Sequence, residues 1–263
     1  MKHNIGVVVV SCDSYSDAWK PFETCFKKFW SDCEYNCYLV NNEKKTGIDG
    51  FSIINTGPEI SWSRKVREAL GKIEEDYILF LLEDYFLTQH IENKMILEDA
   101  EFLQSHNAGY LSYFPVKGME SSEKKGIAVI TEDNIYGKVL QPSLWKKDYL
   151  MQCLYDDDFS AWEFENRQKI SNSKRVLGID YCTSYFPIKW VNGILQGKWF
   201  GPSINYLKKI DIDIDTSTRE ILPWFATKKY QIKSKLFGKL SVDKIKKYRE
   251  IAEKMGVTFV TKS

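Results

Sequence analysis

The expected fold is decided by the stretch Tyr77-Ile78-Leu79-Phe80-Leu81-Leu82-Glu83-Asp84. Its apolar part has the length of a strand, and an unbroken apolar run is typical of a strand buried on both faces in a parallel sheet. Open α/β sheets bind ligands outside the carboxyl ends of their strands, where Glu83 and Asp84 are expected to lie. Adjacent carboxylates there can hold a divalent cation together with substrate phosphates. The alternative is that the two acids only end the strand.

Strands and helices alternate on the amino-terminal side of this stretch. The expected strands are Ile5–Val10, Tyr35–Val40 and Phe51–Ile54, and the expected helices are Asp17–Phe29 and one that Ser61 caps and that runs to about Glu74. With the apolar run as a further strand, the order is βαββαβ. That order predicts an α/β protein, a three-layer αβα sandwich with a mostly parallel central sheet.

The pattern changes after this half. A helix is expected over residues 92–105, followed by short strands and then a further helix. The expected later elements are strands at Tyr110–Val116, Ile127–Ile130 and Tyr136–Leu140, and a helix from Pro142 or Lys146 to Leu154. We expect one domain over residues 1–204, with a first half to about residue 110 and a second half over 111–204. Residues 205–263 form a basic extension whose expected terminal helix runs from Val242 to Met255.

Composition and charge narrow the classes of protein. The chain has 263 residues, 43% of them hydrophobic, which is enough apolar surface for a folded core and excludes a disordered chain. A formal net charge of +1 disfavours a dedicated nucleic-acid binder. The charge is uneven, because residues 205–263 hold 14 Lys/Arg against 7 Asp/Glu, a charge of +7 that leaves −6 on the rest.

Targeting signals and nucleophilic dyads are not evident. The apolar run Ile5–Val10 is too short for the core of a signal peptide, and no run of 18 apolar residues follows it, so we expect a soluble, cytoplasmic protein. The six cysteines are expected to be reduced structural thiols. The three histidines are scattered, which disfavours catalysis by a Ser–His or Cys–His pair.

The order of elements and the acids after the apolar run resemble the GT-A fold of nucleotide-sugar-dependent glycosyltransferases, of the bacterial polysaccharide and lipopolysaccharide type. In that family an Asp-x-Asp motif at this point contacts the ribose and a metal bound to the diphosphate, and Leu82-Glu83-Asp84 stands in its place. The resemblance implies that Asp84 binds a divalent cation, Mn²⁺ or Mg²⁺, and that Glu83 contacts the donor. Leu82 departs from the motif, which leaves metal dependence and ribose recognition open.

Further residues fit the donor side of the resemblance. Ser11 and Asp13 follow the first strand, where the family contacts the nucleoside, and Asn41 ends the second strand. Arg64 and Lys65 open the helix that the family turns toward the donor pyrophosphate, and both a helix N-terminus and a cation suit that anion. The alternative for the two cations is a solvated helix face.

The segment Trp190–Trp199 contains two glycines and Lys198. In the family a late loop often closes over the donor, so the resemblance implies that Lys198 neutralises the departing diphosphate. A hairpin with a glycine turn is the competing interpretation.

A second acidic cluster, residues 156–165, resembles the acceptor-side motif of inverting GT-A enzymes. Either Glu163, slightly favoured, or Glu165 would then take the proton from the acceptor hydroxyl. On an extended segment both face one way, and on a helix they diverge. The alternative is a helix N-cap with acids in its first turn. Three neighbouring aromatic side chains are expected to stack on sugars: Trp145, Trp162 and Phe164.

The resemblance implies a glycosyltransferase that moves a sugar, in a single inverting displacement, from a nucleotide-sugar donor to a saccharide or lipid-linked saccharide. Residues 1–204 would then be its catalytic domain, with a nucleotide-binding half to about residue 110 and an acceptor-side half over 111–204. One alternative is a non-catalytic carbohydrate- or partner-binding protein on the same fold. A sugar-1-phosphate nucleotidyltransferase is disfavoured, because Ser11-Cys12-Asp13-Ser14-Tyr15 has no glycine-rich loop.

Two interpretations of the basic extension stay open. A lysine-rich amphipathic helix there can rest on the anionic inner face of a membrane, near lipid-linked acceptors. Alternatively, the helix docks on the catalytic domain with its lysines in solvent.

Overall fold

The computed structural model describes residues 4–58, 60–131, 137–154, 157–170 and 179–240, together with residues 244 and 247. The chain divides into two compact units, Met1–Val191 and Asn192–Ser263. The expected helix from Val242 to Met255 lies outside the described residues apart from these two positions.

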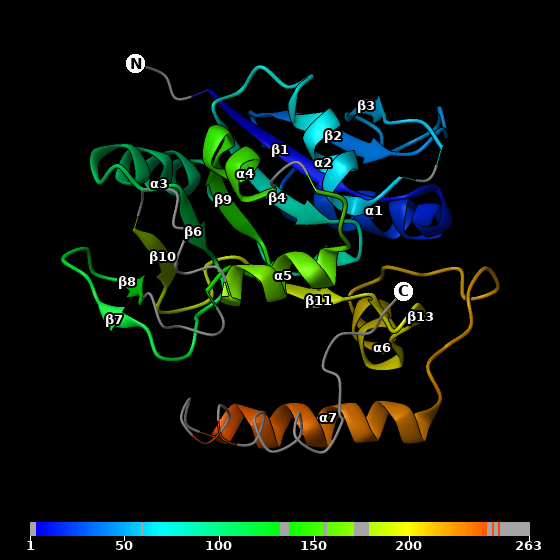
Figure 1. The fold of residues 1–263 in the computed structure, drawn as a ribbon. Helices are drawn as coiled ribbons and strands as arrows, with labels where there is room; N and C mark the ends of the chain where they lie inside the picture. Colours follow the sequence, from blue (N-terminus) through cyan, green and yellow to red (C-terminus); the bar gives the residue numbers. More distant parts are fainter. Residues whose placement is uncertain are drawn as a thin grey trace. The chain divides into compact units, whose positions relative to one another are not determined.

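The first unit is built on one large, mixed sheet (Figure 1). Within the described residues its strands are β1 (Ile5–Val10), β2 (Asn36–Asn41), β3 (Ser52–Asn55), β4 (Tyr77–Leu82), β6 (Tyr110–Ser112), β7 (Glu120–Ser121), β8 (Ile127–Ile130), β9 (Ser143–Lys146) and β10 (Asp180–Thr183). Their order across the sheet is β3-β2-β1-β4-β9-β6-β10-β8-β7. The pairs among β3, β2, β1 and β4 are parallel, as is β6 with β10, and the other four pairs are antiparallel. The parallel pairs join more residues than the antiparallel ones, so by paired length the sheet is mostly parallel as predicted.

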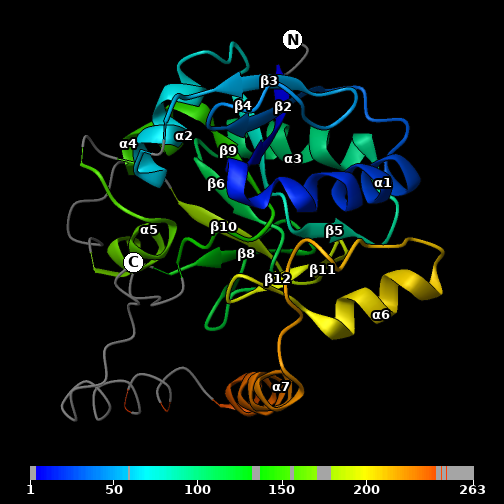
Figure 2. The same cartoon turned by 90° about the vertical axis from the view of Figure 1, so that its right-hand side faces the viewer.

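Helices cover both faces of this sheet and make the expected three-layer αβα sandwich (Figure 2). The helices are α1 (Trp19–Phe29), α2 (Trp62–Leu70), α3 (Asn93–Ser105), α4 (Lys147–Leu154) and α5 (Ala161–Ile170), and a 3-10 helix, η1 (Asp13–Ala18), precedes α1. Figure 2 shows α1 and α3 on one side of the strands and α2, α4 and α5 on the other.

The core follows from the two-residue period of the central strands. Val8 and Phe80 belong to the cluster that packs against α2, α4 and α5. Their neighbours Val7, Val9 and Leu79 are equally buried, and because successive side chains point to opposite faces they meet the layer of α1 and α3. Strands buried on both faces need the continuous apolar sequence that β1 and β4 have.

The expected helix from Pro142 or Lys146 is wrong in its first part. Residues Ser143–Lys146 form β9, which lies antiparallel between β4 and β6, and the helix starts only at Lys147. Four residues give no usable periodicity, and the strand is defined by the two neighbours with which it pairs. The register sets Leu79 opposite Leu144, and both side chains are fully buried.

Other expected boundaries shift. Ser61 caps α2 as predicted, since its Oγ accepts the N–H of Arg64 at 3.3 Å, but α2 ends at Leu70 rather than near Glu74. Beyond Gly71 the chain continues in tighter turns, with the N–H of Ile73 bonded to the carbonyl of Leu70. The expected strand over Tyr136–Leu140 is wrong for its described residues 137–140, and the strand expected over Tyr110–Val116 ends at Ser112.

A small second sheet follows β4. It pairs β5 (Tyr85–Leu87) with β11 (Trp190–Asn192), so the segment after Glu83 and Asp84 is joined to the end of the first unit. The Tyr85 and Trp190 rings lie 5.8 Å apart between centroids.

The second unit contains the hairpin of β12 (Ile194–Leu195) and β13 (Lys198–Trp199), followed by α6 (Gly201–Lys209) and α7 (Trp224–Lys239). The division falls before residue 204 because the Trp199 backbone pairs with residues 220–222: its N–H donates to the Glu220 carbonyl and its carbonyl accepts from Leu222, each at 2.9 Å. In the described part of the chain, none of the helices is both long and apolar enough to cross a bilayer.

A buried polar group fixes α4 against the sheet. The Asp180 carboxylate accepts from Lys138 Nζ at 2.7 Å and from Tyr149 Oη at 2.8 Å, and all three residues are buried. Lys138 also lies over the Tyr149 ring, 5.3 Å from its centroid. The ring is therefore held at its hydroxyl and on its face, and it passes close to Gly109, where a Cβ atom would come within 2.2 Å of it.

We predict that Gly109→Ala lowers the free energy of unfolding by about 1–3 kcal/mol, because the new methyl group overpacks a ring that cannot move aside. Urea unfolding measures the change. Gly71→Ala is the control, since Gly71 has ordinary helical dihedrals and room for a Cβ atom, and it should be neutral or stabilising by up to about 1 kcal/mol. Equal stability of the two variants would contradict the packing described for Tyr149.

Candidate active site

The carboxyl ends of the central strands bring several predicted residues to one edge of the sheet. Val10 pairs with Leu82 on one side and with Val40 on the other. The next residues, Ser11 and Glu83, therefore follow neighbouring strand ends, which lie about 4.8 Å apart in a sheet. We call this the carboxyl edge.

Asp13 organises the loops at the carboxyl edge. Its carboxylate accepts backbone N–H groups of the loop after β2, from Asn42 at 3.2 Å and from Glu43 and Lys44 at 3.1 Å each. The predicted nucleoside contact is thus engaged in joining the loop after β1 to the loop after β2. Any contact of Asp13 with a ligand would be made from this fixed position.

Asn41 also has a structural position. It is fully buried, its Nδ2 donates to the Lys44 carbonyl at 2.8 Å, and its Oδ1 accepts from Asn55 Nδ2 at 2.6 Å. The amide is satisfied at both ends by the protein. Its neighbour Asn42, which sequence reasoning did not select, lies closer to the edge in the network that follows.

The side chain of Lys65, on α2, reaches the carboxyl edge. It is only 5% exposed, and its ammonium group donates to the Ser11 carbonyl at 3.0 Å and to Asn42 Oδ1 at 3.2 Å. Asn42 is also buried, and its Nδ2 has no hydrogen-bond partner among the described residues. A buried donor without a partner costs free energy, which a ligand acceptor at this position would recover.

Arg64 lies elsewhere. Its Nε bonds to Glu68 at 3.0 Å on the exposed face of α2, as in the solvated-face interpretation. The first turn of α2 is occupied by the segment before α5: Ser61 Oγ donates to Asp158 at 2.8 Å, and the Ser63 N–H donates to the Phe159 carbonyl at 3.1 Å. The structure therefore brings Lys65, but not Arg64, to the carboxyl edge.

Glu165 is tied to the segment after Glu83 and Asp84. Its Oε1 accepts the Leu140 N–H at 2.8 Å, and the Leu140 carbonyl accepts the buried Tyr85 hydroxyl at 2.9 Å. Burial raises the pKa of the Tyr85 phenol well above its usual value, and the negative charges of Asp84, Glu165 and Glu83 raise it further. The phenol thus stays a hydrogen-bond donor to the Leu140 carbonyl.

Glu163 has a different role in the same helix. It accepts the Ser160 N–H at 2.7 Å, and its own N–H bonds to Ser160 Oγ at 3.3 Å. This reciprocal pair is a capping box at the start of α5. Because the segment is helical, Glu163 and Glu165 point in different directions, and only Glu165 is placed toward Tyr85 by these bonds.

The aromatic residues at the site differ from those expected. Trp145 and Phe164 are fully buried core residues, so the expectation that they stack on sugars is wrong, whereas Trp162 is 64% exposed. A second aromatic group, missed in the sequence, follows β6 and β10: the Phe114 ring lies 5.3 Å from Phe186 and 6.2 Å from Trp190. We call these three side chains the aromatic ledge. Phe114 and Phe186 come two and three residues after the ends of β6 and β10, and Trp190 begins β11. The sequence carried no signal for Phe114, because the expected strand Tyr110–Val116 ran past it.

No three His, Cys, Asp or Glu side chains of the described residues group closely enough to form a metal site from protein ligands alone. Asp84 and Glu83 are adjacent in the turn between β4 and β5, with Glu83 buried. Two carboxylates fit a cation that draws its other ligands from phosphates and water, as Mg²⁺ commonly does.

Lys198 belongs to the second unit. Gln196 and Gly197 have positive φ angles of 54° and 73° and form a hairpin turn there, which agrees with the competing interpretation of this segment. Lys198 Nζ is bonded to Glu220 at 2.5 Å. Its contact with a departing diphosphate stays a prediction.

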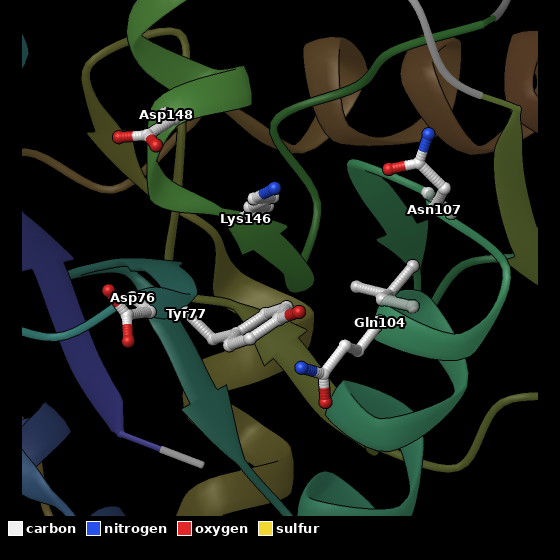
Figure 3. A pocket seen from close by; sticks show the side chains of 8 residues that line it. Asp76, Tyr77, Gln104, Asn107, Lys146 and Asp148 are labelled. Carbon is white, nitrogen blue, oxygen red and sulfur yellow. The ribbon is translucent and has the colours of Figure 1, made fainter.

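A pocket of about 270 Å³ opens at the opposite edge of the sheet, where β4 begins and β9 ends (Figure 3). Asp76, Tyr77, Lys146 and Asp148 are among its lining residues, and Figure 3 shows Lys146 and Asp148 reaching it from β9 and α4. None of the predicted site residues lines it. The amino ends of parallel strands are not where such sheets usually bind ligands, so we place the candidate site at the carboxyl edge.

Comparison with solved structures finds partial similarities. TarS residues 1–349 from S. aureus, in complex with UDP, is 15% identical over 68% of this chain and 57% of that chain, with a TM-score of 0.44. A longer TarS chain is 13% identical over 68% and 34%, with a TM-score of 0.43. A nucleotidyl transferase from Methanothermobacter thermautotroptrophicus is 13% identical over 69% and 88%, with a TM-score of 0.45.

This chain therefore spans between about a third and three-fifths of the TarS chains it matches. No protein-family model matches the sequence, and no curated protein does.

We predict that Glu163→Ala lowers the free energy of unfolding by about 0.5–1.5 kcal/mol, because it removes one half of the capping box. Glu163→Gln should lose less, since glutamine also accepts the Ser160 N–H in this motif. Thermal or urea unfolding of the two variants makes the comparison. Full stability of Glu163→Ala would contradict the capping role.

Proposed function

We propose that the chain transfers a sugar from a nucleoside-diphosphate donor to a hydroxyl acceptor by a single inverting displacement. The observation that supports it most is that Glu165 on α5 and the Tyr85 hydroxyl, next to Glu83 and Asp84 after β4, bond to the two backbone groups of one residue, Leu140. Displacement at an anomeric carbon needs both a base for the acceptor and a site for the diphosphate. These acids lie about eighty residues apart in the sequence and reach one edge of the sheet.

The donor end of the site is assigned to the loops after β1 and β2. Lys65 offers a buried positive charge and Asn42 a buried donor without a protein partner, and both suit a nucleotide's oxygen acceptors. Ser11 shares the network, with its Oγ accepting from Trp19 Nε1 at 2.8 Å. In this proposal Asp13 keeps the loops in place, and Arg64 contributes little.

A divalent cation, Mg²⁺ or Mn²⁺, would be held by Asp84 with Glu83 beside it and by the donor diphosphate. When bound, it would offset negative charge on the diphosphate leaving group. The protein's own share is to place two carboxylates at the end of β4 and to keep Lys65 close to the neighbouring strand end.

Glu165 is assigned as the general base. Its carboxylate accepts the proton of the acceptor hydroxyl while that oxygen bonds to the anomeric carbon and the bond from this carbon to the diphosphate oxygen breaks. The Leu140 N–H holds one carboxylate oxygen at 2.8 Å and so fixes the group's orientation. The sequence slightly favoured Glu163, but its capping bonds make it the weaker candidate.

The acceptor is assigned to the aromatic ledge. Phe114 and Phe186 are more than a third exposed, and Trp190 joins them to Tyr85 beside the acid pair. Flat apolar rings next to carboxylates suit a saccharide, whose ring faces are apolar and whose hydroxyls donate hydrogen bonds.

We predict that a nucleoside diphosphate, tested as UDP, GDP, ADP or CDP with and without Mn²⁺ or Mg²⁺, raises the thermal midpoint of the chain, because it binds the folded state alone. Lys65→Met should abolish the shift and Arg64→Ala should keep it. Stabilisation by simple sugars with none by any nucleotide would instead favour a carbohydrate-binding protein without transfer chemistry.

We also predict that Glu165→Gln slows release of nucleoside diphosphate from the matching nucleotide sugar by about 10²–10⁴-fold, because glutamine cannot accept the proton at that step. Glutamine keeps an oxygen for the Leu140 N–H, so folding and nucleotide binding should persist. Glu163→Gln is the matched control and should stay near the wild-type rate. A wild-type release rate in Glu165→Gln, or a slowed rate in Glu163→Gln and not in Glu165→Gln, would contradict the assignment of Glu165 as the general base.

A further inference from the structure

One side of the helix α7 packs against the rest of the second unit. Its Tyr230 ring lies 5.8 Å from that of Phe200, and Thr227 is buried. These contacts hold the helix along the side that carries Thr227 and Tyr230. Of the other described side chains over residues 224–236, all are exposed except the half-buried Ala226.

Large apolar side chains occupy that open surface. Phe225 is 70% exposed, Ile232 60% and Leu236 58%. Their spacings of seven and four residues place them in one stripe along the helix. At its start Trp224 is 74% exposed. Lys228 and Lys229 lie between Phe225 and Ile232 along this face. Exposed single apolar residues are ordinary on a soluble protein, but several large ones on one face of a helix mark an interaction surface.

Lysines border this stripe on both sides. At about 100° per residue, Lys229 and Lys233 fall along one border and Lys228 and Lys235 along the other. All four are exposed, and the sequence 224–239 contains neither Asp nor Glu. Lys228 also lies 5.9 Å from the Trp224 ring centroid. The partner must therefore present an apolar layer bounded by negative charge.

We propose that α7 seats the protein on the surface of an anionic phospholipid bilayer, with Phe225, Ile232 and Leu236 among the upper acyl chains. Lysine stems are long enough to reach the headgroup phosphates from both borders, and tryptophan is favoured at this depth. The helix lies in the interface. A nucleic acid would neutralise the lysines but leave the apolar stripe in water. A second copy of α7 would bring the lysines of the two helices together, and their positive charges would repel each other.

This proposal does not depend on the sugar-transfer proposal. The sequence expectation of a membrane-binding helix at residues 242–255 stays a prediction, and the present proposal concerns a different helix, α7, which the structure describes.

The test is co-sedimentation of the full chain with vesicles of phosphatidylcholine, with or without phosphatidylglycerol. We expect binding only to the anionic vesicles, weakened by salt. Two variants should each lose about tenfold or more in affinity: Phe225→Gln/Ile232→Gln/Leu236→Gln and Lys228→Gln/Lys229→Gln/Lys233→Gln/Lys235→Gln. The control removes four exposed lysines elsewhere, at Lys20, Lys94, Lys208 and Lys209, and should bind like the wild type.

Circular dichroism confirms that each variant is folded. The proposal is overturned if the wild type stays in the supernatant with anionic vesicles, or if the control loses as much binding as the α7 lysine variant. It is also overturned if the apolar variant binds vesicles normally but changes a dimer into a monomer in solution, because α7 would then be a protein interface.

Discussion

The parallel pairing of β1 with β4 sets the positions on which the candidate site depends. Five further residue pairs lead up to the pair of Val10 with Leu82, and both strands are buried over almost their whole length. A shift of two residues in this register would keep the buried faces but move Ser11 about 6.6 Å along the sheet from Glu83. The hydrophobic sequence of two strands therefore aligns polar residues that take no part in the core.

Once the strands are aligned, polar groups at their carboxyl ends hold two loops and the helix α2 together. Asp13 binds the backbone after β2, Asn42 accepts from the N–H of Asp13, and Lys65 reaches both the Ser11 carbonyl and Asn42 from α2. Burying such groups costs free energy unless each has a partner. Among the residues that the structure describes, the amide Nδ2 of Asn42 is the group of this network that has no hydrogen-bond partner.

Sequence patterns could predict the parts of this arrangement that local forces decide. The strand Tyr77–Leu82 and the Ser61 cap are correct to the residue, because an apolar run and an N-cap each act over a few neighbours. The pattern could not predict β9, which depends on two distant partners. Nor could it separate Glu163 from Glu165, since that choice depends on whether the segment is helical and on what Leu140 approaches.

The most direct test of the account is a crystal structure of the protein with the nucleoside diphosphate that stabilises it best. We expect the diphosphate at the carboxyl edge, within hydrogen-bond distance of Lys65 and on the same side as Asp84, with a polar atom of the nucleotide accepting from Asn42 Nδ2. A nucleotide bound instead in the pocket beside Asp76 and Lys146, at the amino end of β4, would contradict the account.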